Sequence, residues 1–265
     1  MPELINFPVD PLDTPVYRIY PYRIFLQIIQ TQKDRLSSPN TWPDPLDNFL
    51  LRQTQVIDSD GVSLDPSALA NGWYVQCWSL QQNSDAMWRL YGAYKSLAGQ
   101  GGLASINPQN FVECSVQVKS TPRKLLKYLT ETLSHTTDNL FCGYVQYIEE
   151  HEFHAKISGR KYNDFLMAGG QKLLAEFMCL KRMAFAHEQE IRLIYQDITV
   201  DVAHPPSNFH EFAFDPNTLF DEIVLDPRLN DWEYDQVSRS LLSNGITLNV
   251  RQSDLYKGKL FRMPF

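Results

Sequence analysis

The protein has 265 residues, of which 43% are hydrophobic and 21% are charged. This is enough apolar material for a folded core, and a charged fraction near the globular average argues against wholesale disorder. The net charge of -7 argues against general, phosphate-driven nucleic-acid binding, although the 24 Lys and Arg could still form a local basic groove.

Targeting signals and cysteine usage indicate the compartment. No stretch approaches the roughly 20 apolar residues of a membrane-spanning helix, and residues 1–6 lack the basic start of a secretory signal. The four cysteines, Cys77, Cys114, Cys142 and Cys179, lie far apart in apolar or strand-like segments. This spacing predicts buried free thiols rather than a disulfide framework or a zinc site. We therefore expect a cytoplasmic protein with no membrane partner.

The N-terminal part begins with an irregular lead-in over residues 1–15. Val16–Tyr20 is expected to form a short strand that Pro21 closes. Apolar side chains at helical spacing then predict a helix over Tyr22–Leu36. Three prolines within residues 37–45 exclude regular structure there, yet the segment is too aromatic to be a simple linker.

Strands and helices alternate through the middle of the chain. The expected strands are Gly72–Leu80, Phe111–Val118 and Phe141–Glu149. Three helices are expected. The first begins after Asn83 or Ser84, the second begins after Thr121 with Pro122 at the first helical position, and the third spans Asn163–Lys181. Gly99–Gly102 predicts a plain turn.

The last third is richer in strands. They are expected at Glu190–Tyr195, Glu211–Phe214, Ile223–Leu225 and Ile246–Val250, with one helix at Trp232–Leu242. The order of elements lacks a steady βαβ rhythm, and no linker divides the chain. We therefore predict an α+β fold, a single domain over residues 1–265. Its sheet is expected to be mixed and mostly antiparallel, with flanking helices. A sheet that is split into two parts is an open alternative.

Familiar catalytic motifs are missing. The sequence has no P-loop, no G-x-G-x-x-G after a strand, no G-x-S-x-G and no H-E-x-x-H. His151 and His154 lie among charges at the end of a predicted strand, without further ligands, so we expect a solvated segment and no metal site. His187 has no serine or cysteine nucleophile setting to activate.

The densest polar cluster spans Lys181–Arg192. Glu188 and Glu190 are two apart on an incoming strand, so they are expected to project to the same face as Arg192. Two carboxylates this close raise one another's pKa unless a cation or ligand compensates their charge. Such an arrangement costs folding free energy, which suggests that it has a function. An edge strand with a solvated charged face, in which Arg192 bridges to a glutamate, would give the same pattern.

Several pieces of the sequence, in this order, resemble a large family of uncharacterised bacterial proteins that is described only as a domain of unknown function. They are the Tyr17-Arg18 strand, the Ser37–Asp47 loop with Trp42, Asp44 and Pro45, the strand end Cys77-Trp78-Ser79, the helix Met87-Trp88-Arg89-Leu90-Tyr91, and the strand Phe185–Arg192. Together they cover most of the chain. Many members look like components of mobile-element or phage-defence loci, so the resemblance implies a role in bacterial defence.

The order of an early Arg, a Ser on a middle strand and a Glu-x-Glu entering a late strand resembles the Arg–Ser–Glu layout of the ADP-ribosyltransferase superfamily. This resemblance implies NAD as substrate. Glu190 would be the catalytic carboxylate near the ribose, and Glu188 would orient or deprotonate the acceptor. Arg18 would hold the pyrophosphate of NAD with its planar fork.

Other residues would complete the implied NAD site. Ser79 would shape the nicotinamide pocket, and Tyr91 or Trp88 would stack on the ring. The middle strand reads Cys77-Trp78-Ser79 where the superfamily usually has Ser-Thr-Ser, and the Trp42–Pro45 loop has no counterpart there.

Structural roles for the same residues are open alternatives. Trp88 and Tyr91, with Met87 and Leu90, are more typical of a helix that packs into the core than of a ligand site. Arg18 could pair with Asp13 or Glu3. Trp42 and Asp44 would equally suit a loop plug in which the indole fills a gap and the carboxylate caps a turn.

Two functions therefore stay open. One is an NAD-dependent ADP-ribosyltransferase or NAD glycohydrolase in bacterial defence or mobile-element conflict, with a protein or nucleic-acid acceptor and a neighbouring-gene regulator. The other is a non-catalytic protein-interaction module of a defence or toxin–antitoxin locus, which predicts a large exposed apolar patch. A nuclease or phosphoesterase would need about three acidic or histidine ligands around a metal, and the sequence offers no ordered set.

Overall fold

The structure is a computed structural model that describes residues 2–7, 12–57, 60–64, 70–94, 113–133, 139–166, 169–200, 207–258 and 263. Contacts group the chain into two compact units, each made of three segments. Unit 1 comprises residues 1–16, 33–80 and 121–214, and unit 2 comprises residues 17–32, 81–120 and 215–265. The single domain over the whole chain stays a prediction, so each unit is described by itself.

The sheet of unit 1 is centred on β11 (Glu190–Gln196). This strand lies antiparallel to both β6 (Trp73–Ser79) and β8 (Leu140–Tyr144), and β1 (Glu3–Ile5) pairs parallel with β8. All residues of β11 except Gln196 are buried, as expected of a strand with neighbours on both sides. This central position fixes where the charged residues of β11 lie.

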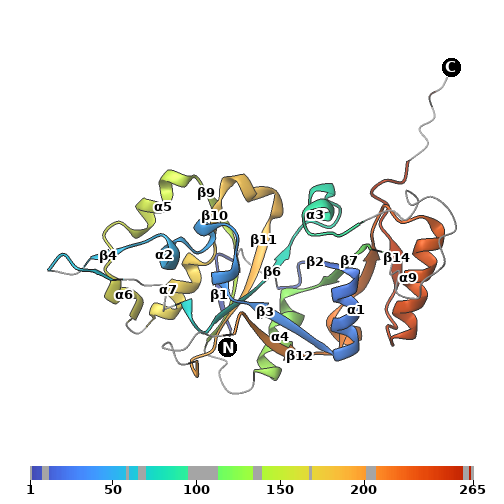
Figure 1. Cartoon of the computed structure of the whole chain (residues 1–265), viewed down its shortest axis with the longest axis horizontal. Coiled ribbons are helices and arrows are strands. Elements are labelled where there is room, and N and C mark those ends of the chain that lie inside the picture. The colour runs from blue at the N-terminus through green and yellow to red at the C-terminus, as the bar shows by residue number, and fades with distance from the viewer. Residues whose placement is uncertain are drawn as a thin grey trace. The chain divides into compact units, whose positions relative to one another are not determined.

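Two further strands extend the same sheet (Figure 1). β3 (Lys33–Ser37) pairs antiparallel with β12 (Phe209–Ala213) and, through Ser37, with Val75 of β6. Apart from the sheet, β9 (Gln146–Ile148) and β10 (Leu180–Arg182) form a parallel pair. The short strands β4 (Val56–Ile57) and β5 (Ser63–Leu64) form an antiparallel pair.

The helices of unit 1 include three short 3₁₀ segments. The α-helices are α2 (Phe49–Arg52), α4 (Pro122–Thr132), α5 (Glu150–Ile157), α6 (Tyr162–Leu166) and α7 (Gly170–Phe177). The 3₁₀ segments are η1 (Pro39–Thr41), η2 (Pro45–Asn48) and η6 (Met183–Glu188). The core beside the sheet is aromatic: the ring of Phe49 lies 4.8 Å from that of Phe153 and 5.6 Å from that of Phe177.

Unit 2 has its own strands and helices. Its strands follow the order β2 (Val16–Pro21), β7 (Ser115–Ser120), β13 (Glu222–Leu225) and β14 (Val250–Gln252). Its helices are α1 (Tyr22–Thr31), α3 (Asp85–Leu90), α8 (Pro216–Leu219) and α9 (Asp231–Ser243). β7 and β13 are antiparallel, whereas β13 and β14 are parallel. The predicted α+β class, with mostly antiparallel strands and flanking helices, is confirmed.

Local chemistry explains the elements that the sequence predicted well. Ser84 caps α3 by accepting a hydrogen bond from the Met87 amide, and Thr121 caps α4 in the same way, with Pro122 at the first helical position. The strands expected from residues 16, 72 and 190 are also present. The four cysteines are free thiols, three of them buried, as predicted.

Several expected elements were wrong. The helix from Tyr22 ends at Thr31 because Gln32 adopts a left-handed φ of 52°, and the next residues form β3. Residues 163–181 are not one helix: α6 ends at Leu166, and Leu180–Arg182 is the strand β10.

Three smaller expectations also fail. The lead-in over residues 1–15 contains β1, and His151 and His154 lie in α5 rather than at a strand end. The last strand, β14, begins only at Val250. The turn at Gly99–Gly102 lies outside the described residues. Within the described residues, no helix is long and apolar enough to cross a membrane.

Candidate functional site

A buried lysine joins three carboxylates in unit 1. The Nζ atom of Lys181 lies 2.6 Å from Glu188 Oε2, 2.9 Å from Glu190 Oε1 and 3.6 Å from Asp47 Oδ2. The four residues come from β10, η6, β11 and η2, and all are buried. The fold therefore brings together charges from separate elements at the start of β11.

Arg192 supplies the second cation. Its guanidinium binds Glu190 Oε2 at 2.8 Å and Asp47 Oδ1 at 3.0 Å, and it also donates to the carbonyl of Met178. The ring centroid of Trp42 lies 4.5 Å from its central carbon, in cation–π contact. We call Asp47, Lys181, Glu188, Glu190 and Arg192 the charge cluster. It contains three carboxylates and two cations.

The backbone between the two glutamates is unusual. Glu188 ends η6 rather than lying on the strand, Gln189 has a left-handed φ of 44°, and Glu190 begins β11. The expectation that both glutamates lie on one strand was therefore wrong. Their carboxylates still meet at Lys181. A left-handed non-glycine residue is a sparsely populated conformation that often marks functional sites.

The two glutamates differ in protonation. Burial raises the pKa of Glu188, and the hydrogen bond and charge of Glu190 raise it further against the effect of Lys181, to about 7. Burial also acts to raise the pKa of Glu190, but Arg192, the hydrogen bond from Glu188 and Lys181 outweigh it. The pKa of Glu190 therefore lies below its ordinary value. At neutral pH Glu190 is ionised, and Glu188 is poised to gain or lose a proton.

Two hydroxyl groups fix the backbone of the glutamates. Ser79, at the end of β6, donates a hydrogen bond of 2.5 Å to the backbone carbonyl of Glu188, and it pairs in register with Glu190. The amide of Glu190 donates to the hydroxyl of half-buried Tyr147 at 2.8 Å. Ser79 therefore lies beside the glutamates and binds the main chain of Glu188.

The Trp-Pro-Asp-Pro segment also belongs to the site. Asp44 accepts a hydrogen bond from the amide of Leu46 and forms an ion pair of 3.0 Å with Arg182. Asp44 therefore caps the turn at the start of η2, and whether it also binds a ligand stays a prediction. We call residues 38–48 the cover segment, because its Trp42 and Asp47 contact both cations that hold Glu190.

The edge-strand alternative is wrong. β11 lies between β6 and β8, and Arg192 is only 1% exposed, so this face is not solvated. The expected bridge from Arg192 to Glu190 is present. A charged face inside the protein needs internal partners, which the charge cluster provides.

The other three predicted NAD-binding residues belong to unit 2. Arg18 lies in β2, with its guanidinium 4.8 Å from the ring of Tyr20. Trp88 in α3 is fully buried, which favours core packing over stacking on a ligand. Tyr91, just after α3, is 43% exposed. The roles of these three residues toward NAD stay predictions.

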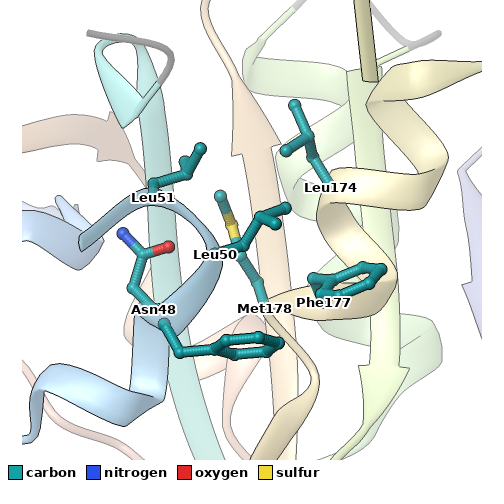
Figure 2. Close-up of a pocket in the computed structure, with 7 residues that line it drawn as sticks. Asn48, Leu50, Leu51, Leu174, Phe177 and Met178 are labelled. Atoms are coloured by element: carbon teal, nitrogen blue, oxygen red, sulfur yellow. The ribbon is translucent and has the colours of Figure 1, made fainter. Parts of the chain in front are cut away.

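A hollow next to the charge cluster is apolar and small (Figure 2). The volume that it offers to a water-sized molecule is about 0 Å³, whereas ligand pockets typically have roughly 300–1,000 Å³. It is lined by Asn48, Phe49, Leu50, Leu51, Leu174, Phe177 and Met178. The Nδ2 atom of Asn48 is buried there and lacks a hydrogen-bond partner among the described residues. The hollow is too small for a dinucleotide.

Two features of the site were missed at the level of sequence. Lys181 was assigned to the end of a helix, although it lies in β10, where a three-residue strand gives too short a pattern to detect. Tyr147 was read as an ordinary strand residue. In the part of the chain that the structure describes, no group of three or more His, Cys, Asp or Glu could hold a metal ion.

Comparisons with known proteins give one set of similar structures. No family model matches the chain, and no curated protein matches its sequence. Among solved structures, the chain is similar to DarT of Thermus sp. 2.9 in complex with NAD+, at 13% identity and a TM-score of 0.40. That match covers 93% of this chain and 98% of that chain.

Two further DarT structures match at 12% identity and cover 98% of the DarT chain. The complex with carba-NAD+ has a TM-score of 0.38 and covers 93% of this chain. The complex with ADP-ribosylated single-stranded DNA has a TM-score of 0.40 and covers 95%. Likeness at this level does not establish a function, so a function for this chain has to be inferred from its own residues.

Proposed function

We propose that this protein cleaves the nicotinamide–ribose bond of NAD, as an ADP-ribosyltransferase or an NAD glycohydrolase, through Glu190 and Glu188. One observation carries the proposal. Two buried glutamates share the ammonium group of Lys181, and their surroundings move their pKa values in opposite directions. Pairs of titratable groups tuned apart in this way are typical of acid–base sites.

The ionised carboxylate of Glu190 suits the first half of the reaction. The bond between ribose C1′ and the nicotinamide nitrogen breaks, and its electron pair leaves with nicotinamide. The ribose then carries oxocarbenium-like positive charge, which a preorganised carboxylate stabilises. The pKa of Glu190 lies below its ordinary value, so this charge is present at neutral pH.

Glu188 suits the second half. An acceptor oxygen or nitrogen attacks C1′, and its proton passes to Glu188, whose pKa of about 7 matches general-base catalysis near neutral pH. A water acceptor gives hydrolysis, and a protein or nucleic-acid acceptor gives transfer. The proposal includes such a macromolecular acceptor, a setting in bacterial defence and a neighbouring-gene regulator, as the sequence resemblances imply.

Access to Glu190 sets a condition on the proposal. The residue is 6% exposed and is held by Lys181 and Arg192. A bound ribose could reach its carboxylate only if neighbouring side chains move. The cover segment contacts both of these cations through Trp42 and Asp47, so we expect its contacts to loosen when NAD binds.

The test is release of nicotinamide and transfer of label from radiolabelled NAD by the purified full chain. The protein is assayed alone, with single-stranded DNA and with a cell lysate. Glu190→Gln is compared with Glu131→Gln; the side chain of Glu131 in α4 is 59% exposed and pairs with Lys127 at 3.9 Å. Activity that only Glu190→Gln abolishes would support the proposal. No release by the folded wild type under any of these conditions, with no rise in melting temperature on adding NAD, would favour the interaction module.

A further inference from the structure

The two glutamates share the cation Lys181. Glu190 forms ion pairs with both Lys181 and Arg192, and Glu188 forms an ion pair with Lys181 at 2.6 Å. Asp47 also contacts both cations, at 3.6 Å from Lys181 and 3.0 Å from Arg192. The ammonium group of Lys181 is therefore the point where all three carboxylates of the charge cluster meet.

The groups around Glu188 come from several elements. Lys181 approaches from β10, Glu190 from β11 and Tyr147 from β9, whose hydroxyl accepts from the Glu190 amide. Asp47 of η2 and Arg192 of β11 act on Glu188 through their ion pairs with Lys181 and Glu190. Of these neighbours, Lys181 lowers the pKa of Glu188 and Glu190 raises it. The balance between them sets the proton affinity of Glu188.

Lys181 is suited to this position by its shape and charge. An ammonium group is compact and has three donors, so it can bind several carboxylates at once, whereas a guanidinium favours bidentate binding to one. Burial would lower the pKa of Lys181, but Glu190 and Asp47 outweigh burial and raise it above its ordinary value. The charge of Lys181 is thus constant while Glu188 titrates.

We propose that Lys181 is a positioning residue of this site: its ammonium group holds Glu188 against Glu190 and leaves Glu188 as the member of the pair that exchanges a proton. The proposal rests on the proposed function for its catalytic meaning. Its geometric content concerns only the cluster itself. Without Lys181, Glu190 would keep Arg192 as a partner, whereas Glu188 would lose the ion pair that favours its ionised form.

The first experiment follows the carboxyl carbons of ¹³C-labelled glutamate by NMR in the full chain as pH is varied. Glu188→Gln assigns the signal, and wild type is compared with Lys181→Met and Lys181→Arg. We expect the titration midpoint of Glu188 to rise by about 1–3 pH units in Lys181→Met. Lys181→Arg, which keeps the charge, should restore a midpoint within about one pH unit of the wild type.

Several results would overturn the proposal. One is a titration midpoint of Glu188 that is the same in Lys181→Met as in the wild type. Another is a Glu188 midpoint in the wild type that equals the ordinary pKa of a glutamate. If Lys181→Met does not fold, Lys181→Gln takes its place, since it also lacks the charge but can still donate hydrogen bonds.

The second readout is the pH dependence of nicotinamide release, which separates this proposal from the proposed function. A purely structural lysine would change melting temperature and leave the midpoint of the pH–rate profile in place, whereas a positioning lysine moves it upward. An inactive wild type whose Glu188 midpoint still responds to Lys181 would refute the function and keep the positioning role. An active enzyme whose Glu188 midpoint is the same in wild type and Lys181→Met would support the function and refute the positioning role.

Discussion

Two buried ionic groups in this protein are built in different ways. In unit 2, the carboxylate of Asp226 is fully buried and accepts three hydrogen bonds from Arg228, through its amide, Nε and Nη2. The guanidinium also lies 4.8 Å from the ring of Tyr94. This group is a closed pair, with one anion and one cation. In unit 1, the charge cluster has three carboxylates on two cations.

The difference shows what an unequal charge count does. In the closed pair, one cation satisfies one carboxylate, and the pKa of Arg228 is raised by its hydrogen bond to Asp226. In the charge cluster, burial raises the pKa of Glu188, and the neighbouring carboxylate of Glu190 raises it further, to about 7. The balanced pair therefore suits a structural role, whereas the cluster contains a glutamate whose pKa lies near neutral pH.

The largest expected effect comes from breaking the closed pair. Asp226→Asn should lower the free energy of unfolding by about 3 kcal/mol, the lower end of the cost of breaking a buried pair, because the side chain of Arg228 that loses its counter-charge is 20% exposed. Urea denaturation measures this loss. Asp235→Asn is the control, since its ion pair with Arg239 is exposed and should contribute less than about 1 kcal/mol. NAD turnover per folded molecule should not change; a large loss of turnover would contradict a purely structural role for the pair.

Neutralising the central carboxylate of the cluster should have nearly as large an effect, but on activity. Glu190→Gln keeps the shape of the side chain and removes the charge that stabilises the developing cation. We expect nicotinamide release to fall about 10²–10³-fold. Full activity in Glu190→Gln together with loss of activity in Asp226→Asn would contradict the assignment of the charge cluster to activity and of the closed pair to structure.

A smaller effect is expected at Tyr147. Tyr147→Phe removes the hydroxyl that accepts the Glu190 amide, and the buried N–H that remains should cost about 1–3 kcal/mol of unfolding free energy. Thermal denaturation measures the change. Tyr128→Phe, at a half-buried tyrosine of α4, is a control for loss of a hydroxyl. Equal losses in the two variants would show that the Glu190 amide gains nothing from Tyr147.

A further effect is a pH slope. Because the folded-state pKa of Glu188 is raised from 4.5 to about 7, protonated Glu188 stabilises the fold below pH 4.5, and this stability is lost as pH rises toward 7. The slope is at most about 1.4 kcal/mol per pH unit. Glu188→Gln cannot ionise, so its unfolding free energy should be flatter over this window. Glu190, with a lowered pKa, acts in the opposite sense and loses stability as pH falls below its unfolded value.

Much of this fold could be predicted from local chemistry. β11 was found because Glu190–Tyr195 alternates, and α3 and α4 were found because Ser84 and Thr121 are strong helix caps. The end of α1 could not be found, because the helical pattern continues past Thr31 and the left-handed Gln32 carries no obvious signature. Tertiary pairing of β3 with β12 overrides the local pattern there.

Only part of the candidate site could be predicted from the sequence. The glutamates and Arg192 stood out because they are close in sequence. The link from Asp47 to Arg192 spans the chain from η2 to β11, and the position of Lys181 depends on the pairing of β10 with β9. Long-range contacts of this kind leave no periodic pattern. The meeting of Glu188 and Glu190 depends on the left-handed Gln189, which the sequence does not reveal.

The most direct measurement is the rate of nicotinamide release from NAD by the wild-type chain as a function of pH, beside Glu188→Gln. The account predicts a rate that rises with pH to a plateau, with a midpoint at about 7 where Glu188 loses its proton, and no such rise in the variant. Release that is absent at every pH, or that rises identically in both proteins, would contradict it.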